Sequence, residues 1–155
     1  MNDLKNITVC FTGHRRDIHK NIESKLDEII TVLCEDGFTY FGVGGAKGFD
    51  FLAAKSVLKA KETYKNIKLI VIVPCKDYYD SWQAEEKAEY FEILKHADKV
   101  KVLYDHYFKG CMLARNRHLV DSSSVCVYYK YVNSGGTAFT VNYATKKKLT
   151  TISVI

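Results

Sequence analysis

The 155-residue sequence predicts an α/β protein with an open, mostly parallel sheet and helices on both faces. Three observations support this prediction. Short apolar runs rich in β-branched residues alternate with segments of helical periodicity along the whole chain. The connections between them are short, which suits strand–helix–strand units. Finally, several of the runs end in a glycine-containing loop, as strands of parallel sheets do before the next helix.

The strands are expected where an apolar run is too short for a helix. The run at 67–73 is continuous and β-branched, which indicates a strand covered on both faces, and Pro74, the single proline, is expected to end it. Other short runs are also rich in β-branched or aromatic residues, and we expect strands at 7–12, 38–43, 99–104, 125–129 and 150–155.

The helices are expected where apolar residues recur every three or four positions. The clearest case is 19–36, where Ile22, Leu26, Ile29, Ile30 and Leu33 form one face and Gly37 suits the end of the helix. A second helix is expected to begin near residues 48–50. The others are expected at 82–96, 111–120 and 136–148.

Bulk composition is that of one globular domain, residues 1–155, with 47% hydrophobic and 26% charged residues. The net charge is +5, but the lysines are spread along the chain. The one lysine run, at 146–148, falls near the end of an expected helix, where cations suit the helix dipole. The sequence therefore does not favour a nucleic-acid partner, whereas its mild positive charge suits an anionic small molecule.

Five cysteines without C-x-x-C spacing indicate reduced, buried thiols rather than disulfides or a zinc site. The first six residues are polar, and no apolar run approaches the length of a membrane helix. From these features we expect a cytoplasmic protein with no membrane partner, no metal and no cofactor.

Three loops are the candidate functional segments because each follows an expected strand. They contain Thr12, Gly13, His14 and Arg15; Gly44, Gly45, Ala46, Gly48, Phe49 and Asp50; and Gly135, Gly136 and Thr137. Parallel strands bring their carboxyl ends to one edge of the sheet, so the loops should line a common cleft. Glycines let the backbone approach a phosphate, and a helix that starts there offers free N–H donors.

Each motif also has a structural interpretation that the sequence leaves open. The glycine pairs suit tight strand-to-helix turns, and Thr137 suits a helix cap. Arg115, with Asn116 beside it on the helix at 111–120, offers a bidentate fork for phosphate. Alternatively it is exposed or pairs with a nearby acid. His14 is a candidate acid/base or a hydrogen-bonding surface residue. Trp82, Tyr78 and Tyr79 suit stacking on a base, or covering the edge of the sheet.

Taken together, these motifs resemble the SLOG superfamily of nucleotide-binding proteins, and within it the YpsA-like branch. The matching segments are CFTGHR at 10–15, GGAKGFD at 44–50, VPC at 73–75 with Trp82, GCMLARNRHLVDSSS at 110–124 and SGGTAFTVNYA at 134–144. They occur in family order over nearly the whole chain. The resemblance implies a Rossmann-like fold and a nucleotide-derived ligand, such as an ADP-ribose-like molecule, in the cleft.

Related SLOG branches include phosphoribohydrolases that cleave the N-glycosidic bond of nucleoside monophosphates. In the resemblance Arg115 takes a position similar to their functional arginine, but Thr140 stands where their motif has a glutamate. A hydroxyl does not replace a carboxylate in this chemistry. Asp50, Asp121 and His14 remain as catalytic candidates.

The sequence thus leaves two main hypotheses. The first is a module that senses or sequesters a nucleotide or nucleotide-derived phosphate ligand, and the second is a hydrolase acting on nucleoside 5′-monophosphates or related nucleotides. An interaction protein with a vestigial pocket is a third reading. A homodimer is also left open, with the Trp82 region as its candidate surface.

Overall fold

The computed structural model describes residues 3–16, 18 and 21–155. Its centre is a six-stranded sheet in the order β4-β3-β2-β1-β5-β6, and every neighbouring pair is parallel. The strands are β1 (Thr8–Gly13), β2 (Tyr40–Val43), β3 (Lys68–Cys75), β4 (Lys99–Tyr104), β5 (Val125–Tyr129) and β6 (Thr150–Ser153). The predicted α/β fold class, a Rossmann-like open parallel sheet, is confirmed.

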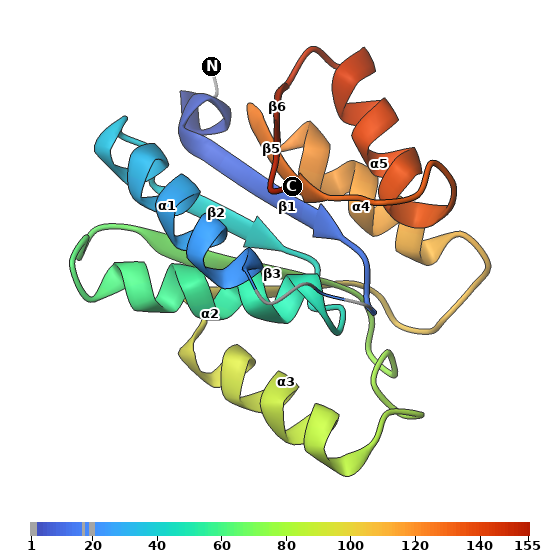
Figure 1. Cartoon of the computed structure of the whole chain (residues 1–155). Helices are drawn as coiled ribbons and strands as arrows, with labels where there is room; N and C mark the ends of the chain where they lie inside the picture. Colours follow the sequence, from blue (N-terminus) through green and yellow to red (C-terminus); the bar gives the residue numbers. More distant parts are fainter. Residues whose placement is uncertain (1–2, 17, 19–20) are drawn as a thin grey trace.

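Helices cover both faces of this sheet (Figure 1). They are α1 (Ile22–Glu35), α2 (Phe49–Lys61), α3 (Ala84–His96), α4 (Cys111–Asp121) and α5 (Gly135–Lys146), with a short 3-10 helix η1 (Asp3–Ile7) before β1. From β1 to β4 the chain moves steadily toward one edge, with α1 to α3 as its crossovers. It then returns through α4 to the other side of β1, and α5 packs against α4. Right-handed crossovers place these two sets of helices on opposite faces.

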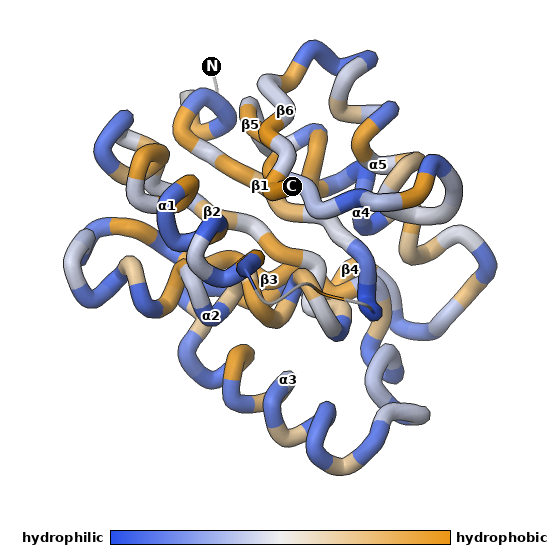
Figure 2. The backbone as a smooth tube through the Cα atoms, in the orientation of Figure 1, coloured by the Kyte–Doolittle hydropathy of each residue, from blue (hydrophilic) through white to orange (hydrophobic). Residues whose placement is uncertain are grey.

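The apolar core lies between the sheet and its helices, and successive strand residues point into its two layers. Val9 and Phe11 of β1 belong to the larger layer, under α1 and α2, whereas Cys10 between them belongs to the smaller layer with Cys126 and Leu119. Figure 2 shows the central strands as mostly hydrophobic and α3 as largely hydrophilic. This two-sided burial explains why the strand sequences are nearly continuous apolar runs.

Several expected element ends differ from those of the structure by one to three residues, and two of the differences have local reasons. Pro74 lies inside β3 rather than after it, because the strand continues to Cys75, which pairs with Tyr104. Proline has an extended φ and only removes one donor, so a position near a strand end tolerates it. The third long helix begins at Ala84 and not at Trp82, because Gln83 and Glu86 form a capping box. The expected start of the first helix, at residue 19, falls outside the described residues.

The order of the strands reverses between β1 and β5, and this reversal positions the site. The connection after β1 leads toward α1 on one face, and the connection after β5 leads into α5 on the other. The two connections therefore diverge and leave a crevice at the carboxyl ends of these neighbouring strands, which is where open α/β sheets bind ligands.

Candidate functional site

A cleft of about 400 Å³ occupies this crevice between β1 and β5. Its lining comes from the loop after β1, the start of α4, the loop after β5 and the start of α5. The loop after β2 contributes at the bottom. The lining residues are Phe11, Thr12, Gly13, His14, Arg15, Arg16, Ala46, Asp50, Met112, Leu113, Arg115, Asn116, Tyr131, Val132, Ser134, Gly135, Gly136 and Thr137.

The structure therefore brings residues of all three predicted loops, together with Arg115 and Asn116, to one cleft. Gly44, Gly45, Gly48 and Phe49 are not among the lining residues. They lie behind the cleft wall, where Gly44, Gly45 and Phe49 are buried and Gly48 is half-buried. Gly48 and Phe49 contact the loop after β1 and Gly44 contacts Arg115, whereas the part of these residues in ligand binding stays a prediction.

First, the loop after β2 is packed directly against the loop after β1. The Phe49 N–H donates to the His14 carbonyl at 3.1 Å. A Cβ on Gly13 would lie 2.4 Å from the Phe49 ring, and one on Gly48 would lie 2.5 Å from the Arg15 carbonyl oxygen. Glycine is required at both positions because the two loops touch there.

Second, two N–H groups of this segment donate to acceptors of the protein. The Ala46 N–H donates to Asp50 Oδ2 at 3.1 Å, and the Phe49 N–H is used as described above. The turn thereby holds the Asp50 carboxylate, which is 6% exposed and lines the cleft. That 44–48 also binds an anion stays a prediction.

Third, Arg115 is locked in place at 3% exposure. Its Nη1 donates to the Gly44 carbonyl, and its Nε donates to Asn116 Oδ1 at 2.7 Å. A Cβ on Gly44 would lie 2.7 Å from the guanidinium carbon, so the glycine makes room for the arginine. Nη2 forms no hydrogen bond to the part of the chain that the structure describes, and it remains available to a ligand.

Burial raises the pKa of the Asp50 carboxyl, and the positive charge of Arg115 and the Ala46 N–H oppose that shift only in part. Asp50 is also the carboxylate among the described lining residues, which include Arg15, Arg16 and Arg115. The cleft is therefore a cationic environment with one buried acid at its base.

The start of α5 has backbone N–H groups without an acceptor in the protein. Ser134 precedes the helix in an extended conformation, and Gly135 has a φ of 90°. Gly135 and Gly136 are exposed, and no acceptor within the described residues takes the N–H of Gly136 or Thr137. Free N–H groups at the positive end of a helix dipole are the kind of donor that anions accept in proteins.

His14 is held by the opposite wall. Its Nε2 accepts the Tyr131 N–H at 3.0 Å, which places its proton on Nδ1, and its ring lies 4.1 Å from the Tyr131 ring. Partial burial, and then the nearby Lys130, lower the pKa of His14. The histidine is therefore neutral, and Nε2, an acceptor in this arrangement, is not a proton donor toward the cleft.

Of the other catalytic candidates, Asp121 lies outside the cleft. It is the last residue of α4, it is exposed, and Oδ1 accepts the Tyr143 hydroxyl proton at 2.8 Å. Thr140, which occupies the position of the hydrolase glutamate, is 2% exposed and donates to the Gly136 carbonyl at 2.8 Å. Neither side chain lines the cleft.

The predicted stacking aromatics are likewise mostly part of the protein interior. Trp82 packs against Phe51, Tyr78 and Tyr90 with ring centroids 5.2 to 5.9 Å apart. Tyr131, which the sequence analysis did not single out, is the exposed aromatic residue of the cleft. A tyrosine in a polar loop carries no periodicity, so its role became visible only once β1 and β5 were neighbours.

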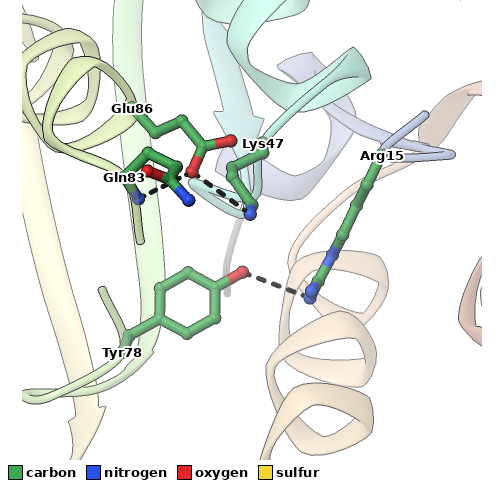
Figure 3. A network of polar contacts seen from close by, with 5 residues as sticks. All are labelled: Arg15, Lys47, Tyr78, Gln83 and Glu86. Atoms are coloured by element: carbon green, nitrogen blue, oxygen red, sulfur yellow. Dashed lines mark hydrogen bonds and ion pairs between the residues drawn. The ribbon is translucent and has the colours of Figure 1, made fainter. Parts of the chain in front are cut away.

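Polar contacts hold Arg15, which lines the cleft, and Lys47, which does not (Figure 3). Arg15 Nη2 donates to the Tyr78 hydroxyl at 3.4 Å, and Lys47 Nζ lies 3.4 Å from Glu86 Oε1. The same Glu86 oxygen accepts the Gln83 N–H at 2.9 Å, which fixes the start of α3. Tyr78 also places its ring centroid 5.9 Å from the guanidinium carbon of Arg115. One tyrosine thus touches both arginines.

No group of three metal-ligating side chains occurs among the described residues, and no helix described here is long and apolar enough to cross a membrane.

Comparison with known proteins places this architecture in a family. A family model named YpsA and described as the YspA SLOG family matches residues 5–154. A UPF0398 protein of Halalkalibacterium halodurans is 28% identical over 130 residues, which cover 82% of this chain and 69% of the relative. A UPF0398 protein of Staphylococcus saprophyticus is 32% identical over 93 residues, covering 60% of this chain and 47% of the relative.

Solved structures share the fold at lower identity. DNA processing protein A of Streptococcus pneumoniae superposes with a TM-score of 0.69 and 17% identity, covering 97% of this chain and 50% of that one. The Helicobacter pylori protein of the same name, from a study of its single-stranded DNA binding mode, gives a TM-score of 0.70 and 20% identity, over 96% of this chain and 65% of that one. The chain thus spans about half to two thirds of these longer proteins. By its sequence match over nearly the full length, the chain belongs to the YpsA branch of the SLOG family.

Proposed function

We propose that the cleft binds a nucleotide or a nucleotide-derived phosphate ligand, in a sensing or sequestering role in the cytoplasm. The observation that carries this proposal is the convergence of Arg115 and the free N–H groups of α5 on the same 400 Å³ cleft. A volume in this range suits a small organic ligand rather than a lone ion.

The phosphate is assigned to the α5 wall. The Gly136 and Thr137 N–H groups point their partial positive charge at it, and the free Nη2 of Arg115 adds a charge-assisted donor. The arginine is already immobilised by Gly44 and Asn116, so little side-chain entropy is lost on binding.

The remainder of the ligand is assigned to the apolar and aromatic part of the lining. Met112, Leu113 and Val132 offer apolar surface, and the Tyr131 ring offers a stacking face supported from behind by His14. A base or ribose fits this chemistry, whereas inorganic phosphate uses only half of the cleft.

Titration calorimetry with AMP, ADP-ribose and NAD tests the proposal, with adenosine as the ligand that lacks phosphate. We expect AMP to bind at least tenfold more tightly than adenosine, because adenosine leaves the α5 N–H groups without a partner. Equal affinity for AMP and adenosine, or no binding by any of these ligands, would contradict the proposal.

Arg115→Lys should weaken AMP binding by about tenfold or more, because a lysine lacks the planar fork that reaches both Gly44 and the ligand. Arg117→Lys is the matched control. Arg117 lies two residues further along α4, where its guanidinium packs over the Phe139 ring at 5.8 Å and does not line the cleft.

A second candidate, hydrolysis of the N-glycosidic bond of a nucleotide, is favoured by one observation. Asp50 is a buried carboxyl of raised pKa that lines the cleft. A raised pKa favours the protonated form, which is the form that a general acid needs. Chromatography of the free base after incubation with nucleoside monophosphates distinguishes the candidates. If wild type releases the base and Asp50→Asn does not, the protein is the hydrolase. If neither protein releases the base and Asp50→Asn binds AMP as tightly as wild type, the protein is the binding module.

The DNA processing proteins raise a single-stranded nucleic acid as a further ligand to be tested. An oligothymidine competitor in the AMP titration serves this purpose. Because contacts to many phosphates make binding strongly salt-dependent, displacement that disappears steeply with added salt would indicate a nucleic-acid ligand. For the mononucleotide proposal we expect no displacement.

A further inference from the structure

Strand β4 (Lys99–Tyr104) forms one edge of the sheet and pairs only with β3 among the described strands. Its other side therefore presents a row of unpaired backbone N–H and C=O groups. The strand is unusually exposed for a parallel sheet: Leu103 is partly buried and the other five residues are exposed.

The two faces of β4 have different chemistry. Val100, Val102 and Tyr104 pair with Val71, Val73 and Cys75, which are buried under the helices of the larger core layer. They extend this apolar layer beyond the edge and are 39%, 41% and 40% exposed. Phe108, in the following loop, packs on Tyr104 with ring centroids 4.7 Å apart.

The opposite face carries Lys99, Lys101 and Leu103. Asp105 follows immediately after the strand. The Asp105 side chain is 77% exposed and forms a surface ion pair with Lys76 at 3.1 Å. The edge thus carries cations at its start, a carboxylate just after its end and an apolar stripe on the other face.

We propose that β4 pairs antiparallel with β4 of a second copy of this chain, about a two-fold axis at Val102, so that two six-stranded sheets become one. In this register Val102 faces its own copy and Val100 faces Tyr104 of the second copy. The apolar stripes become one continuous patch, which is the arrangement that stabilises cross-strand pairs.

The charges and the apolar stripe of the edge together favour this register. Directly opposite residues of antiparallel strands share a face, so the axis at Val102 places Lys99 opposite Asp105 of the second copy and Lys101 opposite Leu103. An axis at Lys101 places Lys101 opposite its own copy, a like-charge pair. An axis at Leu103 also makes an attractive pair, Lys101 with Asp105, but it places Val100 beyond the end of the second strand, opposite His106, and so shortens the apolar stripe.

This interface differs from the one that the sequence suggested. Trp82 and Tyr78 are packed against other aromatic rings rather than forming a free surface, whereas β4 is open. The β4 edge is separated from the cleft at β1 and β5 by β3 and β2. The proposed dimer therefore does not depend on the proposed ligand, and each is tested separately.

Cysteine crosslinking tests the axis. In Val102→Cys the two new thiols face each other across the axis, within reach of a disulfide, so we expect a covalent dimer under mild oxidation. Val100→Cys is the matched control, because it is equally exposed on the same face but opposite Tyr104 and far from its own copy. The wild-type chain, with the partly buried Cys34, measures background crosslinking. Equal crosslinking of the two variants would overturn the register.

Sedimentation equilibrium tests the association itself, with wild type expected at twice the mass of one chain. Lys99→Asp should weaken the dimer about tenfold, because two like-charge pairs replace two attractive ones. Adding Asp105→Lys to that variant should restore it. These substitutions are at exposed sites, and circular dichroism checks that each variant is folded. A wild type that stays monomeric at every concentration, or a charge swap without rescue, would overturn the proposal.

Discussion

At the scale of single residues, the site depends on side chains that are held before any ligand arrives. Arg115 is fixed by Gly44 and Asn116, Asp50 by Ala46, and His14 by Tyr131. In three of these contacts the partner is a backbone group, and in the contact between Arg115 and Asn116 it is the side-chain amide. Pre-positioned groups of this kind bind a ligand with little loss of conformational entropy.

The hydrogen bond at His14 predicts a pH dependence. Because the folded-state pKa of His14 is lowered below its unfolded value of 6.5, this residue contributes stability above pH 6.5 that is lost as the pH falls through the folded-state pKa. Protonation also removes the acceptor for the Tyr131 N–H. We expect wild type to lose thermal stability between pH 7.5 and about 5 relative to His14→Gln, which keeps an acceptor but does not titrate. Parallel pH profiles of the two proteins would contradict this.

Tyr78 is expected to position the arginines chiefly through its ring. Tyr78→Phe removes only the 3.4 Å contact to Arg15, a long hydrogen bond, and should change AMP affinity by less than about threefold. Tyr78→Leu also removes the aromatic face beside Arg115 and should weaken AMP binding about tenfold. Calorimetry on both variants separates the two contacts. If Tyr78→Phe is as damaging as Tyr78→Leu, the hydroxyl matters more than the ring.

At the scale of elements, the glycines of the loops after β1 and β2 differ in their surroundings from those of the loop before α5. The loops after β1 and β2 are pressed together, and their glycines allow close approach. The loop before α5 touches nothing at Gly135 and leaves the helix start exposed. The three motifs look alike in sequence because glycine suits a turn, a close contact and an exposed helix start equally well.

This difference predicts distinct costs for alanine substitutions. Gly13→Ala places a methyl group 2.4 Å from the buried Phe49 ring, and we expect a loss of about 1–3 kcal/mol in the free energy of unfolding. Gly37→Ala is the comparison, because Gly37 has a φ of 96° but no atom near its missing Cβ. Its cost should be limited to backbone strain of about 1 kcal/mol. Urea unfolding measures both, and a smaller loss for Gly13→Ala than for Gly37→Ala would contradict the packing argument.

At the scale of the whole molecule, ligand binding should be visible as stabilisation of the folded state. AMP at a hundred times its dissociation constant should contribute about 2.7 kcal/mol. For a chain of this length that raises the melting temperature by about 5–10 °C. Differential scanning fluorimetry with wild type and Arg115→Lys at the same AMP concentration measures it. A shift that adenosine reproduces in full would show that the phosphate contributes nothing.

The sequence by itself determined the alternation of strands and helices, because apolar periodicity and glycine punctuation are local properties. The strands at Lys99–Tyr104 and Val125–Tyr129 were placed to the residue, and the parallel sheet followed from the short connections. It also indicated which loops meet at one edge of the sheet, since parallel strands have their carboxyl ends at the same edge.

Tertiary structure alone decided which groups reach the cleft. The Ala46 and Phe49 N–H groups donate to Asp50 and His14, Asp121 lies at the far end of α4, and Tyr131 becomes a wall of the site. The place of Tyr131 depends on a contact between residues 117 positions apart, that of its N–H with His14. Such contacts follow from the order of the strands, and local periodicity carries no information about that order.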